Sequence, residues 1–255
     1  MGFRYVSVDE AIAADGLRMV VLGGVPSAWG ESAKGILHVK GLDWLAIRLD
    51  YKNEALTRWT GQQSGPVAIY EHEQPRDGWA AILLLAERLA ADPPLLPANP
   101  EERAWTLGLS HEILGEGGLA WTRRLQLVHA GLQERGGFPA RVASYLGKKY
   151  GYSPARGQLY AGRVATLLQM LVRRLRSQQA SGGYLFGSTL TVADIYCATT
   201  MALFRPLPPE ICEMQLPLRA AFETQDEQTA VALDPILFEH RDRIYARHLA
   251  LPLSL

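Results

Sequence analysis

A buried helix is predicted to start within the stretch Ser188-Thr189-Leu190-Thr191-Val192-Ala193-Asp194-Ile195-Tyr196. Thr191 can serve as the N-cap, because Asp194 stands three residues later, where its side chain can accept a hydrogen bond from the Thr191 backbone N–H. The Thr191 hydroxyl can in turn accept from the Asp194 N–H, and Leu190 can pack against Ile195 as a hydrophobic staple. This pattern favours folding and carries no catalytic chemistry of its own.

The segments on either side extend the pattern, with Gly183-Tyr184-Leu185-Phe186-Gly187 before it and Cys197-Ala198-Thr199 after it. Together they resemble the start of the central buried helix in the C-terminal domain of glutathione transferases. The resemblance implies an α/β plus all-α fold, in which a thioredoxin-like domain precedes an all-helical one. It also implies glutathione as co-substrate and no metal.

The composition favours a protein of two small domains that works on small molecules. The chain has 255 residues, of which 48% are hydrophobic, enough to bury a sizeable core. Its 26 basic and 26 acidic residues balance, so no overall field attracts nucleic acid or an anionic membrane. We therefore expect neither nucleic acid nor a membrane among its partners.

The cysteines and the amino terminus favour a cytoplasmic location. Cys197 and Cys212 fit neither a metal-ligand spacing nor a Cys-x-x-Cys motif, which argues against a disulfide scaffold and thiol redox catalysis. Acidic residues follow soon after the amino terminus, so a signal peptide is not expected. The most apolar run, Ala80 to Leu85, is too short to cross a bilayer.

The first part of the chain is predicted to form the thioredoxin-like domain, over residues 15–90. Strands are expected over 17–22, 44–49 and 65–70, and helices over 28–40 and 78–89, with a short helix after Ser7 ahead of them. The first strand, helix and second strand make a βαβ unit with parallel strands. A fourth strand before the last helix is not visible in the sequence.

The remainder, over residues 100–255, is predicted to be all-helical. A stiff proline-rich connector, Asp92 to Pro100, precedes it, and Asn99 can cap the first helix. Further helices are expected over 119–132, 158–179, 192–204 and 235–249. The segment 136–157, rich in glycine and tyrosine, is predicted as loop or short helix and is longer than a plain connector requires.

Ser27 is the candidate catalytic residue. It stands in Val25-Pro26-Ser27-Ala28-Trp29-Gly30, and Gly41-Leu42 resembles the family's Gly-Leu at the end of the same helix. In serine-type glutathione transferases a hydroxyl here hydrogen-bonds the glutathione sulfur; the resemblance assigns that role to Ser27 and a glutathione contact to Trp29. A hydroxyl donor and the helix dipole can lower the thiol pKa from about 8.5. The alternative is that Ser27 only caps the helix. Cysteine-type chemistry is not expected, because serine occupies this place.

Three further segments carry the glutathione site that the resemblance implies. Gly65-Pro66 corresponds to the family's cis-proline, with glycine in place of a bulkier residue. Arg76-Asp77-Gly78 falls where the γ-glutamyl end is held: Asp77 faces the ammonium group, while Arg76 and the Gly78 N–H face the carboxylate. Lys52 is placed to meet the carboxylate at the glycine end. The simpler alternatives are a strand start, a turn and a surface charge.

The second substrate of such enzymes lies between the two domains, against the first helix of the C-terminal one. His111 and Glu112 stand midway along that helix, where His111 can act as an acid, a base or a polar anchor. Tyr145 is predicted to line the same pocket, and Tyr152 fits a pocket wall or ordinary packing. A purely structural role is the alternative for each of these side chains.

The sequence thus predicts a glutathione transferase whose bound thiolate attacks a small hydrophobic electrophile, and the resemblance implies a homodimer. Conjugation, thioether cleavage, isomerisation and dehalogenation are all compatible with it. The alternatives are a non-catalytic ligand carrier or protein-interaction module, and an enzyme that uses another thiol. Arg123-Arg124 and the run 173–176 are interpreted as solvated helix faces. Gly23-Gly24 lacks the spacing of a dinucleotide site.

Overall fold

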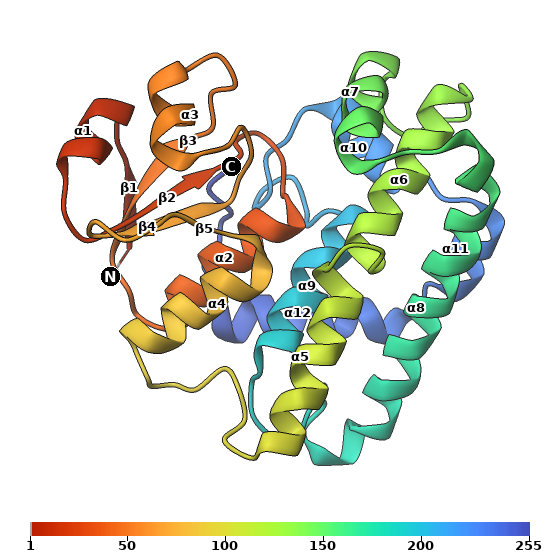
Figure 1. Cartoon of the computed structure of the whole chain (residues 1–255). Helices are drawn as coiled ribbons and strands as arrows, with labels where there is room; N and C mark the ends of the chain where they lie inside the picture. The colour runs from red at the N-terminus through yellow and green to blue at the C-terminus, as the bar shows by residue number, and fades with distance from the viewer. Residues whose placement is uncertain (1) are drawn as a thin grey trace.

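The computed structural model describes residues 2–255, and its amino-terminal part is built on a five-stranded sheet (Figure 1). The strand order is β1-β3-β2-β4-β5. β1 and β2 run parallel to β3 between them, whereas β4 is antiparallel to β2 and β5. The strands are β1 (Phe3–Tyr5), β2 (Leu17–Val21), β3 (Trp44–Arg48), β4 (Val67–Tyr70) and β5 (Arg76–Asp77).

Helices cover both faces of this sheet, because successive side chains of its central strand point to opposite sides. Met19 and Val21 belong to the main core, which the helices α2 and α4 complete. Val20 belongs to a smaller cluster with Ala11 of α1 and Leu56 of α3. These helices are α1 (Val8–Ala13), α2 (Ala28–Val39), α3 (Glu54–Thr60) and α4 (Gly78–Leu89).

The predicted βαβ unit, the strand after it and the covering helix are confirmed. The short helix after Ser7 also forms, and the Ser7 hydroxyl accepts from the Glu10 N–H at 3.2 Å. The sequence did not reveal β1, β5 or α3. The two strands have three and two residues, too few to show the alternation that marks a strand.

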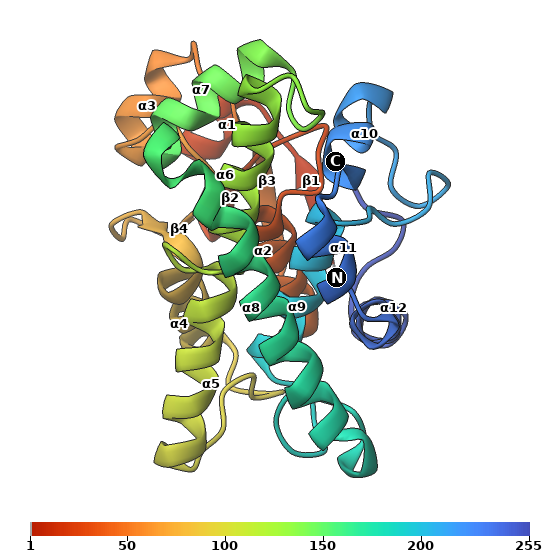
Figure 2. The same ribbon diagram turned by 90° about the vertical axis from the view of Figure 1, so that its right-hand side faces the viewer.

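The rest of the chain is helical, and Figure 2 shows α12 end-on beside the other helices. Its α-helices are α5 (Pro100–Leu114), α6 (Leu119–Leu132), α7 (Ala140–Tyr150), α8 (Gly157–Ser177), α9 (Val192–Thr200), α10 (Leu216–Glu223), α11 (Glu227–Ala232) and α12 (Pro235–His248). Within the segment 136–157, α7 is followed by a short 3-10 turn. The polar segment before α12 holds α10 and α11, which the sequence did not predict. No helix within residues 2–255 is long and apolar enough to cross a membrane.

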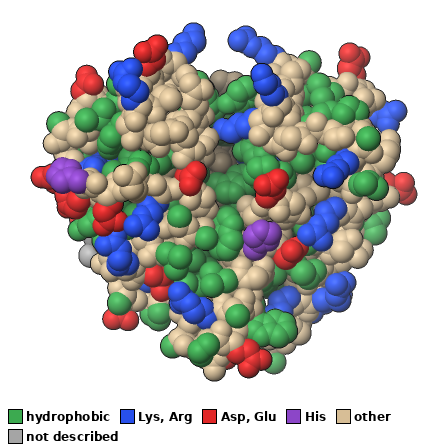
Figure 3. Space-filling model, in the orientation of Figure 1, with side chains coloured by type: hydrophobic (Ala, Val, Ile, Leu, Met, Phe, Trp, Pro, Cys, Tyr) green, Lys and Arg blue, Asp and Glu red, His purple; other side chains and the backbone are tan. Residues whose placement is uncertain are grey.

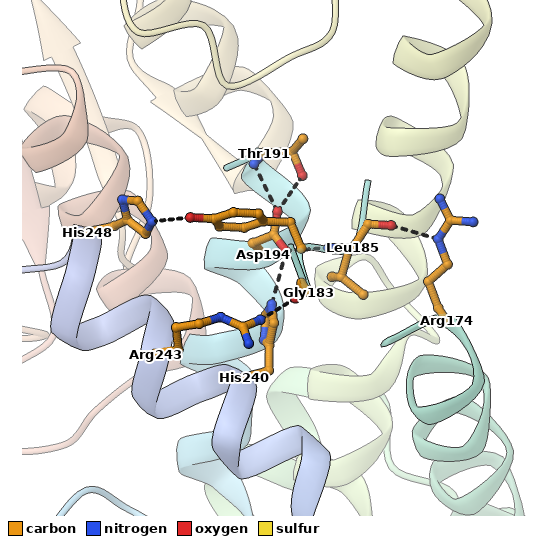
Figure 4. Close-up of polar contacts among 9 residues, drawn as sticks. Arg174, Gly183, Leu185, Thr191, Asp194, His240, Arg243 and His248 are labelled. Atoms are coloured by element: carbon orange, nitrogen blue, oxygen red, sulfur yellow. Dashed lines mark hydrogen bonds and ion pairs between the residues drawn. The ribbon is translucent and has the colours of Figure 1, made fainter. Parts of the chain in front are cut away.

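α9 is the centre of the helical part, and all nine of its residues are buried. The predicted capping box is present: the Asp194 carboxylate accepts from the Thr191 N–H at 2.9 Å and from the Thr191 hydroxyl at 2.8 Å. The same carboxylate accepts from the Leu185 N–H at 2.7 Å and lies 3.0 Å from His240 Nε2 on α12 (Figure 4). One buried carboxylate therefore joins α9, α12 and the loop before α9.

α9 also connects the two parts of the molecule, since it packs against α2 as well as α5 and α12. The Ser32 hydroxyl of α2 lies 2.6 Å from the Thr199 hydroxyl of α9. The connector after α4 docks on the start of α9, where the Leu95 carbonyl accepts from the Val192 N–H at 2.9 Å. The sheet and the helices therefore share one continuous core.

Gly131, inside α6, is expected to tolerate no side chain. A Cβ there would collide with the Phe138 carbonyl, because the loop after α6 folds back against the helix. Gly131→Ala should lower the free energy of unfolding by about 2 kcal/mol or more in denaturant titrations. In α5, a Cβ at Gly108 would meet nothing within 4 Å. Gly108→Ala should therefore raise the free energy of unfolding by up to about 1 kcal/mol, because alanine favours the helix more than glycine does. Equal effects at the two positions would contradict this packing argument.

Candidate functional site

Ser27 lies where the turn after β2 enters α2, at the helix N-cap. Its carbonyl accepts the first helical bond, from the Glu31 N–H at 2.8 Å, as an N-cap carbonyl does. The residue is 4% exposed, yet its hydroxyl makes no hydrogen bond to the helix or to any other group in residues 2–255. The hydroxyl is therefore free to donate at the positive end of the helix dipole.

Gly65 and Pro66 precede β4 and are joined by a cis peptide bond. β4 pairs with β2, so this segment lies beside the strand that leads to Ser27. A Cβ at Gly65 would stand 3.3 Å from the Val20 carbonyl oxygen, which is tighter than ordinary contact. The close approach to β2 accounts for glycine here.

Asp77 and Gly78 form the junction between β5 and α4. The Asp77 carboxylate makes no cap bond to α4 and accepts instead from the Gln62 side-chain amide at 3.0 Å. Gln62 in turn accepts from the Ser64 hydroxyl at 2.6 Å. Gly78 has φ +74°, a conformation that favours glycine over the serine common in the resembled family. No local sequence pattern indicated Gln62, because only the fold brings its side chain to Asp77.

The two candidate cations of the sheet domain lie on its surface. Arg76 donates to Glu73 at 3.0 Å, and Glu73 also accepts from Arg88 at 2.6 Å. These two arginines lower the pKa of the Glu73 carboxyl below its ordinary value. Lys52 is exposed, with its backbone N–H bonded to Asp50 at 2.9 Å. Arg76 is therefore held by an acidic partner, whereas Lys52 is an exposed residue.

The candidate pocket residues of the helical part divide into two groups. His111 is exposed and stands edge-on to Trp79 of α4, with 6.3 Å between the ring centroids. Glu112, its neighbour, forms an ion pair with Arg163 of α8 at 2.5 Å. Tyr145 of α7 meets Tyr51 of the sheet domain edge-on at 5.8 Å. The structure therefore brings His111 and Tyr145 to different points of the domain boundary.

Trp29 ties the start of α2 to the helical part. Its indole Nε1 donates to the Leu114 carbonyl at 2.9 Å, and the Arg124 guanidinium lies 4.6 Å from its ring centroid. The interpretation of Arg123 and Arg124 as solvated residues is wrong, since they are 1% and 7% exposed. Arg123 stays buried because distant backbone carbonyls accept from it. Arg124 stays buried against the rings of Trp29 and Tyr150, which belong to other helices.

The molecular face of Figure 3 is hollowed between the sheet domain and the helices. Hydrophobic side chains line the hollow, a basic side chain reaches into its upper part, and acidic side chains flank it lower down. The turn with Ser27 and the aromatic residues around Arg124 belong to this domain boundary, as their contacts across it show. A free hydroxyl beside an apolar hollow suits a polar ligand next to an apolar one.

Comparison with known proteins finds similar structures but no similar sequence. No family profile matches the sequence, and no curated protein sequence matches it. A glutathione S-transferase of Methylobacterium radiotolerans in complex with glutathione sulfonate matches the structure over 91% of both chains, with TM-score 0.62 and 18% identity. A glutathione transferase family member of Pseudomonas fluorescens with two glutathione bound matches over 94% of both, with TM-score 0.63 and 17% identity.

A third match is a glutathione transferase of Pseudomonas putida with one glutathione disulfide bound per subunit. It covers 94% of this chain and 92% of that one, with TM-score 0.61 and 15% identity. The class of protein is thus defined at the level of the fold. The chain has the glutathione S-transferase fold, a thioredoxin-like sheet domain followed by a helical domain, as the sequence predicted.

The two cysteines should behave as buried structural residues. Cys197 and Cys212 are unpaired and fully buried, and burial raises the pKa of both thiols. A thiol-specific reagent at pH 8 should label them on the order of a hundredfold more slowly in the folded protein than in denaturant. Rapid labelling of either thiol in the folded protein would instead indicate a reactive cysteine.

Proposed function

We propose that the protein is a glutathione transferase-like enzyme in which Ser27 stabilises the glutathione thiolate for attack on a small hydrophobic electrophile. The observation that carries the proposal is the unbonded Ser27 hydroxyl at the N-terminus of α2. A serine that only caps a helix accepts from an N–H of its first turn, and Ser27 does not. The fold shared with glutathione transferases supports the same role.

The chemistry of the other candidate residues supports glutathione as the ligand. The backbone of Gly65 can pair with the cysteinyl part, Asp77 can receive the ammonium group, and the Gly78 N–H can meet the adjacent carboxylate. Gln62 orients Asp77. When bound, glutathione supplies a thiol whose sulfur forms a bond to the electrophilic carbon, while the leaving group takes the bonding electrons and the thiol proton goes to solvent.

Ser27 lowers the pKa of that thiol by donating to the sulfur, and the α2 dipole adds to the effect. Trp29 fixes the start of α2 against the end of α5. His111 and Tyr145, at separate points of the domain boundary, are the proposed contacts for the apolar substrate. Glu112 is proposed to act only through its pairing with Arg163.

We extend the proposal to the assembly and location of the protein. A homodimer follows from the resemblance, with the sheet domain of one subunit facing the helical domain of the other. Two unpaired cysteines are consistent with a reducing, cytoplasmic environment. Sedimentation at micromolar concentration tests the dimer directly.

Calorimetric titration of glutathione into the purified protein at pH 7.5 tests the binding half of the proposal. We expect saturable binding that weakens about tenfold in Asp77→Asn, which removes a charged hydrogen-bond partner of the ammonium group. Asp15→Asn is the matched control. Asp15 is also exposed, but it precedes β2, whereas Ser27 follows that strand at its other end. No heat at millimolar glutathione would favour the carrier, or an enzyme of another thiol, over the proposed function.

A further inference from the structure

Arg124 is a nearly buried cation that no carboxylate neutralises. The residue is 7% exposed, and no ion pair among residues 2–255 includes it. One terminal nitrogen donates to the Tyr150 hydroxyl, and Nε is buried with no hydrogen-bond partner. An arginine offers five N–H donors, so most of the hydrogen-bonding capacity of this guanidinium is not used within the described chain.

The preceding residue shows how this helix satisfies an arginine that has only a structural role. Arg123 donates from Nε to the Leu203 carbonyl at 3.1 Å and from one terminal nitrogen to Gln126 at 2.6 Å. Its other terminal nitrogen donates to the carbonyls of Phe222 at 2.9 Å and Thr224 at 2.5 Å. Every side-chain nitrogen of Arg123 thus donates a hydrogen bond. The Arg124 guanidinium is buried to a similar extent, but within the described chain it donates only to Tyr150.

Aromatic rings hold the Arg124 guanidinium at the domain boundary. Its central carbon lies 4.6 Å from the Trp29 ring centroid and 4.9 Å from that of Tyr150. Trp121, one turn earlier on α6, stands edge-on to Tyr150 at 4.7 Å. We call Trp29, Trp121, Arg124 and Tyr150 the Arg124 cluster. Because Trp29 follows Ser27 by two residues, the cluster lies beside the proposed reaction site.

The surroundings of the cluster are tyrosine hydroxyls and a second cation. Burial, Tyr145 and Tyr150 raise the pKa of Tyr51 to about 12, and Arg124 acts against that rise. Burial lowers the pKa of Lys149, and Arg124 lowers it further. Among the described residues, no carboxylate contributes to either pKa shift. The electrostatic surroundings of the cluster therefore favour an incoming anion.

We propose that Arg124 binds a carboxylate on the second substrate, so that the enzyme prefers planar apolar electrophiles that carry an anionic group. The guanidinium fork matches the two oxygens of a carboxylate, and such charge-assisted bonds are the strong ones. The rings of Trp29 and Tyr150 flank the guanidinium and present flat apolar surface for the rest of the molecule. The inference rests on the proposed function, because it requires that the cleft beside Ser27 takes a second substrate.

Binding of two unreactive probes tests the inference without turnover. Naphthoate carries a carboxylate on a planar apolar body, and naphthamide has the same shape without charge. Calorimetry should show naphthoate binding about tenfold or more tightly than naphthamide, the value of one or two charge-assisted hydrogen bonds. Arg124→Met should abolish this preference and leave the naphthamide affinity unchanged. Arg124→Gln, which keeps an amide donor for Tyr150, should lose the preference as well.

The controls separate the outcomes. Arg141→Met removes an exposed positive charge from α7, the helix that carries Tyr150, and should keep the naphthoate preference. Equal affinity of the wild-type protein for both probes would overturn the inference. So would a preference that survives in both Arg124 variants while glutathione binding weakens, because the anion held by Arg124 would then be glutathione itself. Naphthoate preference without any glutathione binding would contradict the proposed function alone.

Discussion

Replacing Asp194 with alanine should lower the free energy of unfolding by about 3–5 kcal/mol. The carboxylate is fully buried: one oxygen accepts from the Thr191 N–H and hydroxyl, and the other accepts from the Leu185 N–H and lies against His240. Its removal leaves these donors buried without an acceptor, and a buried donor without a partner destabilises the folded state by its full desolvation free energy. Since folded proteins are stable by only about 5–15 kcal/mol, the melting temperature should fall by about 10 °C or more.

Asp234→Ala is the matched control for Asp194→Ala. Asp234 also caps a helix, α12, where it accepts from the Ile236 N–H at 3.0 Å, but it is only half-buried. Its loss should lower the free energy of unfolding by about 1 kcal/mol. Similar melting temperatures for the two variants would show that the buried contacts of Asp194 do not fix α9 in place.

The second large effect is on turnover. Ser27→Ala should reduce the glutathione-dependent rate on an aryl halide such as chlorodinitrobenzene by about 10²–10³-fold at pH 7, the size found when one donor to a developing anion is removed. The rate should also keep rising with pH up to about 8.5 in the variant, because the thiol returns to its ordinary pKa. In the wild-type protein the rate should level off at lower pH.

Ser32→Ala separates this effect from damage to α2. Ser32 is a buried serine on the same helix, and its hydroxyl bonds across the domain boundary to Thr199. Its removal should lower the melting temperature and leave the pH profile of the rate unchanged. An identical pH profile in Ser27→Ala and wild type would mean that the thiolate is stabilised by other groups.

Much of the fold was predictable because helix starts are local. Thr191 and Asn99 each act as an N-cap where the sequence predicts one, since capping depends on residues only two or three positions apart. α3 carried comparable signals in Asn53 and in Gly61, which adopts the left-handed conformation after the helix. These signals were not used in the prediction, although similar capping predicted α1, which has only six residues.

The candidate site was predictable only in part. The place of Ser27 at a helix start follows from local sequence, but the freedom of its hydroxyl depends on which groups the fold brings near it. The burial of Arg123 depends on carbonyls about eighty to a hundred residues away, which no local pattern reports. The contacts of Gln62 and Arg124 could not be predicted either, since their partners Asp77 and Trp29 come from other elements.

The two edges of the sheet bear on how copies of this chain can associate. β1 and β5, at the edges, have three and two residues. An edge strand recruits another chain through its row of unpaired N–H and C=O groups, and strands this short offer very few of them. Extension of the sheet by edge-to-edge pairing of many copies is therefore disfavoured. Specific self-association would instead use the side chains of the helices.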